Sequence, residues 1–214
     1  MKWLDRVLQK WRIAKASRYI ADQACVLDVG CPDGELFRQC CSRIKGGVGI
    51  DPDLSNNLAL PGVRLIRGHF PQDLPEPGTF DAITMLAVLE HVPPDAQPAL
   101  SKACADALKP GGHLVITVPA PTVDRVLDVL KFLHLVDGMS LEQHYGFDAR
   151  QTPAIFSESG LKLLRHETFQ LGLNNLFVFE KPIQLELRGG PTAIGERRAG
   201  GLRQSGREPD GQPL

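Results

Sequence analysis

Two short segments near the N-terminus constrain the fold of this chain more than any other part of it. Residues 26–34 read VLDVGCPDG, an apolar run that breaks at a glycine turn and is followed by a helix-compatible stretch at 35–41. Residues 48–51 read VGID, a second apolar run that ends in an acid. Strand, glycine loop, helix, strand and carboxylate in this order are typical of a site that binds a nucleoside at the carboxyl ends of parallel strands.

The residue types at these positions suit that task. Gly30 and Gly34 allow positive φ or a close approach of the backbone to a ligand. Asp51 can accept two hydrogen bonds from the diol of a ribose. The sequence therefore predicts a nucleoside site between the first two strands.

Composition narrows the class of protein. The 214 residues suit one well-buried domain, and the formal net charge of −1 argues against a protein that grips nucleic acid through phosphates. The five cysteines are odd in number and lack a CxxC pair, and the six histidines show no ligand spacing, so we expect neither disulfides nor a metal site. Because no apolar run reaches the roughly 18 residues of a membrane span, we expect a cytoplasmic protein.

Alternating strand and helix patterns predict a parallel sheet covered on both faces. We expect an amphipathic helix over residues 1–21, packed on the domain with a solvated basic face; a membrane-surface or RNA-binding role is the alternative. The domain itself spans 22–184, and the Gly- and Arg-rich segment 185–214 is expected to be disordered. Within the domain, the expected strands are 25–29, 46–50, 63–67, 80–85, 113–118, 160–165 and 174–180, and the expected helices are 35–42, 95–108 and an amphipathic stretch at 122–136.

The chain resembles a class I S-adenosylmethionine-dependent methyltransferase of the broad small-molecule type. The resemblance covers residues 25–182 and depends on four segments in order: VLDVGCPDG, GVGIDPD, FDAITMLAVLEHV and LKPGGHLVITVP. It implies a Rossmann-like, doubly wound, seven-stranded and mostly parallel sheet whose last strand is antiparallel. It also implies S-adenosylmethionine as cofactor and a small-molecule acceptor that the sequence does not identify.

The resemblance also implies which residues bind the cofactor. Asp28, Gly30 and Gly34 would surround its methionine portion, and Asp51 would hold the ribose hydroxyls. Phe70 could cover the adenine face or belong to the core. The full predicted set is Asp28, Gly30, Cys31, Gly34, Asp51, Pro52, His69, Phe70 and Leu86.

Two positions depart from the family's pattern. Pro32 replaces the middle glycine of the loop and removes one backbone donor, although the loop can still turn through its two remaining glycines. His69 stands where such enzymes often place an acid near the adenine. These departures motivate an alternative, a non-catalytic binding or assembly protein that retains the fold. A nicotinamide-dependent oxidoreductase is disfavoured because GCPDG lacks the GxGxxG spacing.

Methyl transfer needs a base only when the acceptor is protonated, so positioning and exclusion of water can supply much of the catalysis. Three side chains are candidates for proton transfer or acceptor contact: His91, His144 and Tyr145. A structural role is an alternative for each histidine, and for Glu90-His91 it would be to close a short helix before Val92. No Asn/Asp-Pro-Pro-aromatic motif follows the fourth strand, which argues against a DNA base or a protein glutamine as acceptor.

Overall fold

A computed structural model describes residues 3–54, 60–75, 79–120 and 147–183, all of which belong to one compact unit, Met1–Gln184. The predicted tail at 185–214 and the predicted amphipathic stretch at 122–136 lie outside the described residues. No described helix is both long enough and apolar enough to cross a membrane.

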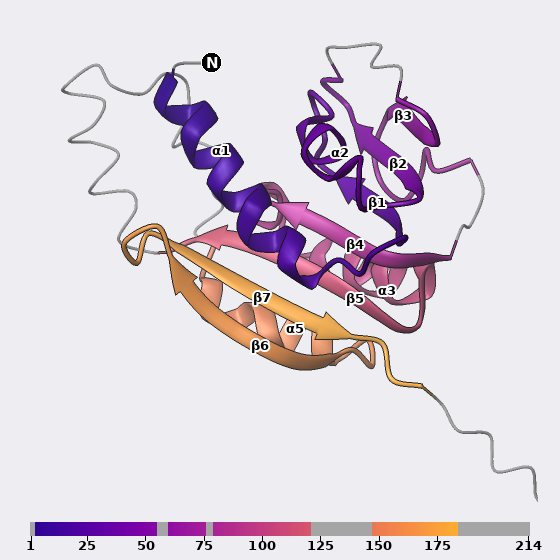
Figure 1. The fold of residues 1–214 in the computed structure, drawn as a ribbon. Helices are drawn as coiled ribbons and strands as arrows, with labels where there is room; N and C mark the ends of the chain where they lie inside the picture. Colours follow the sequence, from indigo (N-terminus) through magenta and orange to yellow (C-terminus); the bar gives the residue numbers. More distant parts are fainter. Residues whose placement is uncertain (1–2, 55–59, 76–78, 121–146, 184–214) are drawn as a thin grey trace, which may run out of the picture. The chain divides into compact units, whose positions relative to one another are not determined.

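Seven strands form one sheet in the order β3-β2-β1-β4-β5-β7-β6 (Figure 1). Strands β1 to β5 pair in parallel, whereas β7 runs antiparallel to both β5 and β6. This arrangement confirms the predicted Rossmann-like sheet with an antiparallel last strand. The strands are β1 (Cys25–Val29), β2 (Gly46–Asp51), β3 (Val63–Arg67), β4 (Phe80–Leu86), β5 (Leu108–Pro119), β6 (Lys162–Phe169) and β7 (Asn174–Glu180).

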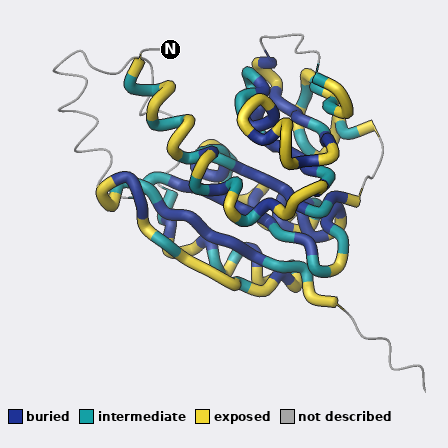
Figure 2. Tube along the Cα trace, viewed as in Figure 1, coloured by how far each residue is buried: buried dark blue, intermediate teal, exposed yellow. Residues whose placement is uncertain are grey.

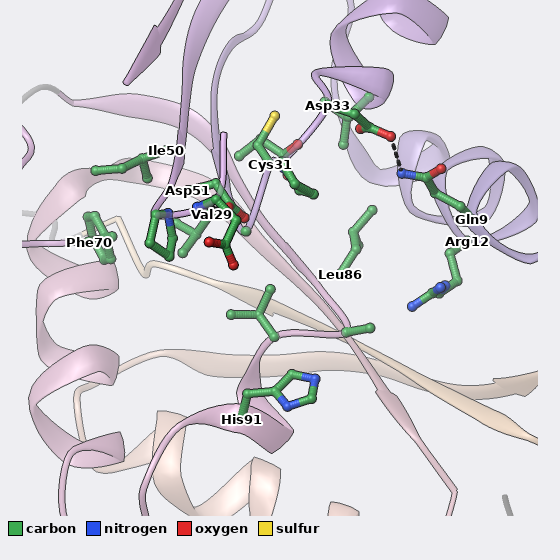
Figure 3. Close-up of a pocket in the computed structure, with 18 of the residues that line it drawn as sticks. Gln9, Arg12, Val29, Cys31, Asp33, Ile50, Asp51, Phe70, Leu86 and His91 are labelled. Atoms are coloured by element: carbon green, nitrogen blue, oxygen red, sulfur yellow. Dashed lines mark hydrogen bonds between the residues drawn. The ribbon is translucent and has the colours of Figure 1, made fainter. Parts of the chain in front are cut away.

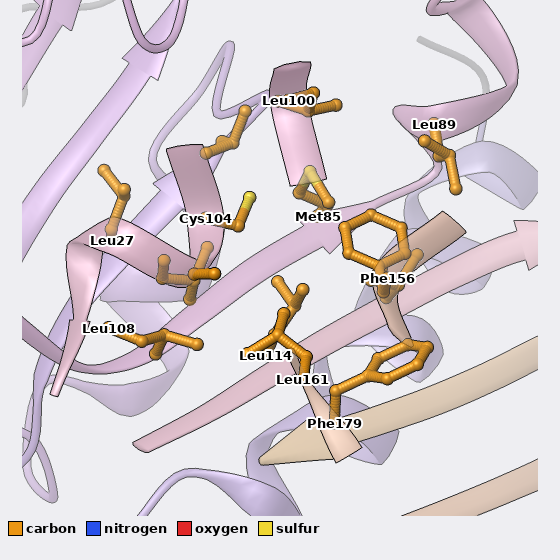
Figure 4. Packing of buried hydrophobic residues seen from close by; sticks show 14 of the residues in the cluster. Leu27, Met85, Leu89, Leu100, Cys104, Leu108, Leu114, Phe156, Leu161 and Phe179 are labelled. Carbon is orange, nitrogen blue, oxygen red and sulfur yellow. The ribbon is translucent and has the colours of Figure 1, made fainter. Parts of the chain in front are cut away.

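Helices cover both faces of this sheet because alternate side chains of each central strand point to opposite sides. On one face, α1 (Trp3–Ala16) and α2 (Glu35–Cys40) pack against residues such as Val26 and Ala82. On the other face, α3 (Gln97–Ala107) and α5 (Thr152–Ser157) cover the larger core, which contains Phe156 and Phe179 with ring centroids 5.3 Å apart (Figure 4). Three 3₁₀ turns complete the described elements: η1 (Ser17–Tyr19), η2 (Leu89–His91) and η4 (Ala149–Gln151). Strands β1, β2 and β4 are accordingly mostly buried (Figure 2).

The segment Lys109-Pro110-Gly111-Gly112 differs from its prediction. The sequence predicts a helix that ends at 108 and a strand that begins at 113, but β5 already begins at Leu108, which pairs with Phe80. The next registered pair is His113 with Ala82, so the four intervening residues bulge out of the ladder. Backbone bonds to Lys181 hold this bulge, since the Gly111 N–H donates to the Lys181 carbonyl at 2.7 Å and the Lys181 N–H donates to the Gly112 carbonyl at 3.0 Å.

Helix α1 is fastened to the antiparallel end of the sheet by polar contacts. The Glu167 carboxylate on β6 accepts from the Tyr19 hydroxyl at 2.6 Å and pairs with Lys15 and Arg165. In the β6–β7 turn, the Gln170 side-chain amide donates to the Leu8 carbonyl at 2.9 Å. These contacts fix the helix by side chains at both halves of its length.

Replacing Glu167 with Gln tests this attachment. The hydrogen bonds from Lys15, Tyr19 and Arg165 lower the pKa of Glu167 to about 2. The ionised carboxylate therefore stabilises the folded state at pH values above its ordinary pKa of 4.5, and this stabilisation is lost as the pH falls toward 2. We expect Glu167→Gln to lower the free energy of unfolding by about 1 kcal/mol at neutral pH, measured by urea denaturation. The difference from wild type should shrink below pH 4. The exposed Glu158→Gln is the control and should have no effect; an equal loss in both variants would contradict the assignment.

Candidate functional site

A cavity of about 790 Å³ opens at the carboxyl ends of β1, β2 and β4, the edge where parallel α/β sheets bind ligands. Its walls come from the loop after β1, the ends of β2 and β3, the segment after β4, and α1 (Figure 3). Its volume lies within the range of ordinary small-molecule and cofactor sites.

The loop after β1 depends on a glycine at position 30. Gly30 has φ +80°, and its N–H donates to the Ile50 carbonyl of β2 at 2.9 Å. A Cβ at this position would lie 2.2 Å from the Val88 Cγ2, so a side chain would collide with the segment after β4. Gly34 has φ +69° and precedes α2, but it does not line the cavity. The expectation that the loop turns through these two glycines in spite of Pro32 is therefore confirmed.

Asp28 places a carboxyl group at the base of this loop. Only 5% of the residue is exposed, and the Thr84 hydroxyl of β4 donates to its Oδ1 at 2.6 Å. Burial raises the pKa of Asp28 to about 7 in spite of that hydrogen bond. Burial and the adjacent Asp28 carboxyl also raise the pKa of the Cys31 thiol, so Cys31 lines the cavity as a neutral, weakly polar side chain.

Asp51 ends β2 and brings the second carboxyl group to the cavity. Its Oδ1 accepts from the Asp53 N–H at 2.7 Å, and its backbone carbonyl accepts from the Gly68 N–H at 3.1 Å. The residue is 8% exposed, and burial raises its pKa above the usual value. These two bonds fix the carboxyl group at the edge where β2 meets the end of β3.

The segment after β3 supplies one wall of the cavity. The His69 N–H donates to the Asp73 carboxylate at 2.7 Å, and the His69 side chain is exposed. Phe70 lines the cavity and also packs, partly buried, against the larger core. Its packing agrees with the core alternative, and contact of Phe70 with an adenine stays a prediction.

The structure brings most of the predicted residues to one place. The cavity is lined by Asp28, Gly30, Cys31, Asp51, Pro52, His69, Phe70, Leu86 and His91. Figure 3 shows the His91 ring at the side of the cavity opposite Cys31 and Asp33. His144 and Tyr145 lie outside the described residues.

Sequence reasoning missed the contribution of α1, whose residues Asp5, Leu8, Gln9, Arg12 and Ile13 form a wall of the cavity. The Gln9 side-chain amide donates to the Asp33 carboxylate at 3.0 Å, which ties the helix to the glycine loop. Burial lowers the pKa of Arg12, and the carboxyl groups of Glu90 and Asp5 oppose that effect. A signal was present: Arg12 lies four residues after Leu8 and four before the buried Ala16, on the inner side of the helix.

Glu90 is buried in η2, close enough to Arg12 of this wall for the two charges to interact. It is 1% exposed, and its Oε2 has no hydrogen-bond partner among the described residues. Burial raises the pKa of Glu90 to about 7, while its own backbone N–H and the charge of Arg12 act in the opposite direction. The expectation that Glu90 and His91 close a short helix agrees with η2, which ends at His91.

Comparison with known proteins gives a consistent family. Residues 2–168 match the family described as "Methyltransferase domain". The ubiquinone biosynthesis O-methyltransferases of Xanthomonas campestris pv. campestris (strain B100) and Xylella fastidiosa (strain M23) are 35% and 37% identical to the chain over 112 and 113 residues. These matches cover 48% and 49% of this chain but only 46% and 44% of the relatives, so the chain spans about half the length of those proteins.

Solved structures share the fold. The N-methyltransferase NodS of Bradyrhizobium japonicum WM9 matches with a TM-score of 0.62 at 16% identity, covering 84% of this chain and 99% of that one. The 1,6-didemethyltoxoflavin-N1-methyltransferase of Burkholderia thailandensis, solved with 1,6-didemethyltoxoflavin and S-adenosylhomocysteine, matches with a TM-score of 0.61 at 16% identity. That match covers 85% of this chain and 81% of the other.

Replacing Glu90 with Gln tests the buried charge. Because the folded-state pKa of about 7 lies above the ordinary value of 4.5, the folded state holds the proton more tightly, and stability falls as pH rises from about 4.5 to 7. We expect Glu90→Gln to remove this loss and to raise the free energy of unfolding at pH 8 by about 1–3 kcal/mol relative to wild type, measured by urea denaturation. The gain should vanish near pH 4. A gain or loss that does not change with pH would contradict the burial of a titrating carboxyl group.

Proposed function

The chain belongs to the methyltransferase domain family, whose enzymes use S-adenosylmethionine, and from this premise we propose that it methylates a small-molecule acceptor in the cavity beside α1. The observation that carries the proposal is the convergence of the glycine loop, two buried carboxyl groups and His91 on one cavity. The relatives' names and the small molecule in the Burkholderia structure support a small acceptor.

The residues present fit an adenosyl sulfonium. We propose that Asp51 accepts hydrogen bonds from the ribose hydroxyls and that Phe70 and His69 lie along the adenine. The Gly30 loop, with no side chain at its closest point, would approach the methionine portion. Asp28 gains its charge near pH 7, and a cation beside it would favour the ionised form.

Arg12 completes the match at the methionine end. Arg12 is the only arginine or lysine among the described residues that line the cavity, and it offers a fixed positive charge there. We propose that its guanidinium binds the methionine carboxylate, because a guanidinium pairs with a carboxylate through two parallel hydrogen bonds. Gln9, which bonds Asp33, would hold α1 against the loop while this pair forms.

The cofactor, when bound, supplies a methyl group activated by a positive sulfonium. The protein's part is to hold the acceptor in line and to exclude water. His91 lines the cavity, and we propose that its imidazole takes the proton that a hydroxyl or amine acceptor loses. Leu8, Ile13 and Val88 add apolar surface to the same cavity.

Replacing Asp51 with Asn tests the cofactor site. Loss of the charge-assisted hydrogen bonds to the ribose should lower the affinity for S-adenosylhomocysteine about 10- to 100-fold, measured by isothermal titration calorimetry. Asp53→Asn is the matched control, because Asp53 lines the same cavity but is exposed. The affinity of this variant for S-adenosylhomocysteine should stay within about twofold of wild type. Unchanged affinity in Asp51→Asn would remove the ribose assignment.

Replacing His91 with Gln tests the base and, with it, the acceptor class. We expect labelled methyl groups to pass from S-adenosylmethionine into the small-molecule fraction of a cell extract, and His91→Gln to slow this transfer about 10²-fold or more. Its affinity for S-adenosylhomocysteine should match wild type, which separates a lost base from a disturbed cofactor site. Label that enters RNA or protein instead would overturn the proposed acceptor class.

A further inference from the structure

Helix α1 has an outer side that the cavity does not use. Its inner side is occupied, because Ile13 and Ala16 are buried and Leu8 and Arg12 line the cavity. Trp3, Val7 and Trp11, which follow one another at intervals of four residues, lie on the outer side. Sequence reasoning expected this helix to turn a basic face to solvent, but three large apolar side chains share that face.

The exposure of these side chains is high for their type. Trp3 is 77% exposed, Val7 39% and Trp11 46%. Tryptophan side chains are on average well buried in folded proteins. A row of exposed apolar side chains marks an interaction surface more often than scattered single ones do. Over eight residues of helix the row spans about 12 Å. We name Trp3, Val7 and Trp11 the outer ridge.

Positive charge accompanies the outer ridge. Arg6 and Lys10 are exposed one turn apart beside it, and the exposed Arg18 follows in η1. The acid of this helix, Asp5, belongs instead to the wall of the cavity. The exposed residues of α1 from position 3 to 14 are therefore two tryptophans, a valine, an alanine and two cations, with no carboxylate.

We propose that the outer ridge of α1 docks the protein on an anionic lipid surface, with the tryptophans at headgroup depth. Tryptophan favours the interface between headgroups and acyl chains, and Lys and Arg beside an apolar row are attracted to anionic lipids. A self-association through this face would place Arg6 and Lys10 near their own copies, because a two-fold interface joins the same surface to itself. RNA would gain little from Val7, which offers no face for base stacking.

Helix α1 is held rigidly enough to present a docking surface. The helix is held by Gln170 at Leu8, by Glu167 at Lys15, and by Asp33 at Gln9. The outer ridge is therefore presented on a helix fixed at three points, so docking would cost little ordering entropy. Leu171, 93% exposed, lies in the β6–β7 turn next to the residue that bonds Leu8, and it adds apolar surface near the same helix.

The chain offers a direct probe of this docking. Its two tryptophans, Trp3 and Trp11, both belong to the outer ridge, so all tryptophan fluorescence reports on this face. We expect the emission of the full chain to shift to shorter wavelength on adding vesicles of equal parts phosphatidylcholine and phosphatidylglycerol. The protein should also sediment with these vesicles, and much less with vesicles of phosphatidylcholine alone.

Variants separate the two parts of the surface. Replacing Arg6 and Lys10 together with Gln should lower the partition coefficient about 25-fold, or about fivefold for each charge. Replacing Trp3 and Trp11 together with Ala should lower it about tenfold or more. Ile183→Ala, which removes a 68% exposed apolar side chain after β7, is the matched control and should bind vesicles like wild type. Each variant should keep wild-type affinity for S-adenosylhomocysteine, which shows that it folds and keeps the cofactor site separate from this test.

Four results would overturn the proposal. The first is a wild-type protein that does not sediment with either kind of vesicle, and the second is equal binding to both kinds. The third is a concentration-dependent dimer, seen by light scattering and lost in the tryptophan variant, without vesicle binding; this would make the face a contact between copies. The fourth is binding to single-stranded RNA without vesicle binding, which would assign the face to nucleic acid.

Discussion

The close approach of three strand ends at Gly30 is the constraint on which the site depends. The Gly30 N–H bonds the end of β2 through Ile50, and its Cα faces Val88 after β4 with no room for a Cβ. This contact closes the base of the cavity and sets the direction in which the loop continues to Asp33. It also explains why Pro32 is tolerated: the turn is made by the positive φ of Gly30 and Gly34, which proline at an intervening position does not alter.

Around that contact, more acidic than basic side chains line the cavity. Asp28, Asp33, Asp51 and Asp53 line it, whereas Arg12 stands at its α1 wall. In the absence of a cation, burial favours the protonated, neutral form of Asp28, as its raised pKa shows. A ligand that brings a sulfonium and an ammonium group together with a carboxylate satisfies both signs of charge, and this is the charge pattern of S-adenosylmethionine. The unfavourable burial of acids before binding is then offset by the ligand.

The sequence predicted the sheet well because its signals are local. The apolar runs before Gly30 and Asp51, and the antiparallel pair that ends at Glu180, each carry their own strand pattern, and eight of the nine predicted cofactor residues line the cavity. Two of the three exceptions depend on contacts distant in sequence. Gly34 shapes the loop from outside the cavity, the bulge at 109–112 is held by Lys181, and the place of Arg12 depends on bonds from α1 to Asp33 and Glu167. A helical pattern shows that one side is buried, but not that a cavity lies beneath it.

Helix α1 joins two surfaces that would otherwise be independent. Its inner side carries Arg12 and Leu8 into the cavity, and its outer side carries Trp3 and Trp11, only one or two helical turns away. The Gln9 side chain of this helix also donates a hydrogen bond to Asp33 of the glycine loop, so α1 contacts the loop directly. Docking of the outer ridge would stabilise the position of α1 against the cavity, and the affinity for S-adenosylhomocysteine would rise with it by linkage. The size of that coupling is bounded by how much freedom α1 retains, which the bonds to Leu8, Lys15 and Gln9 already make small.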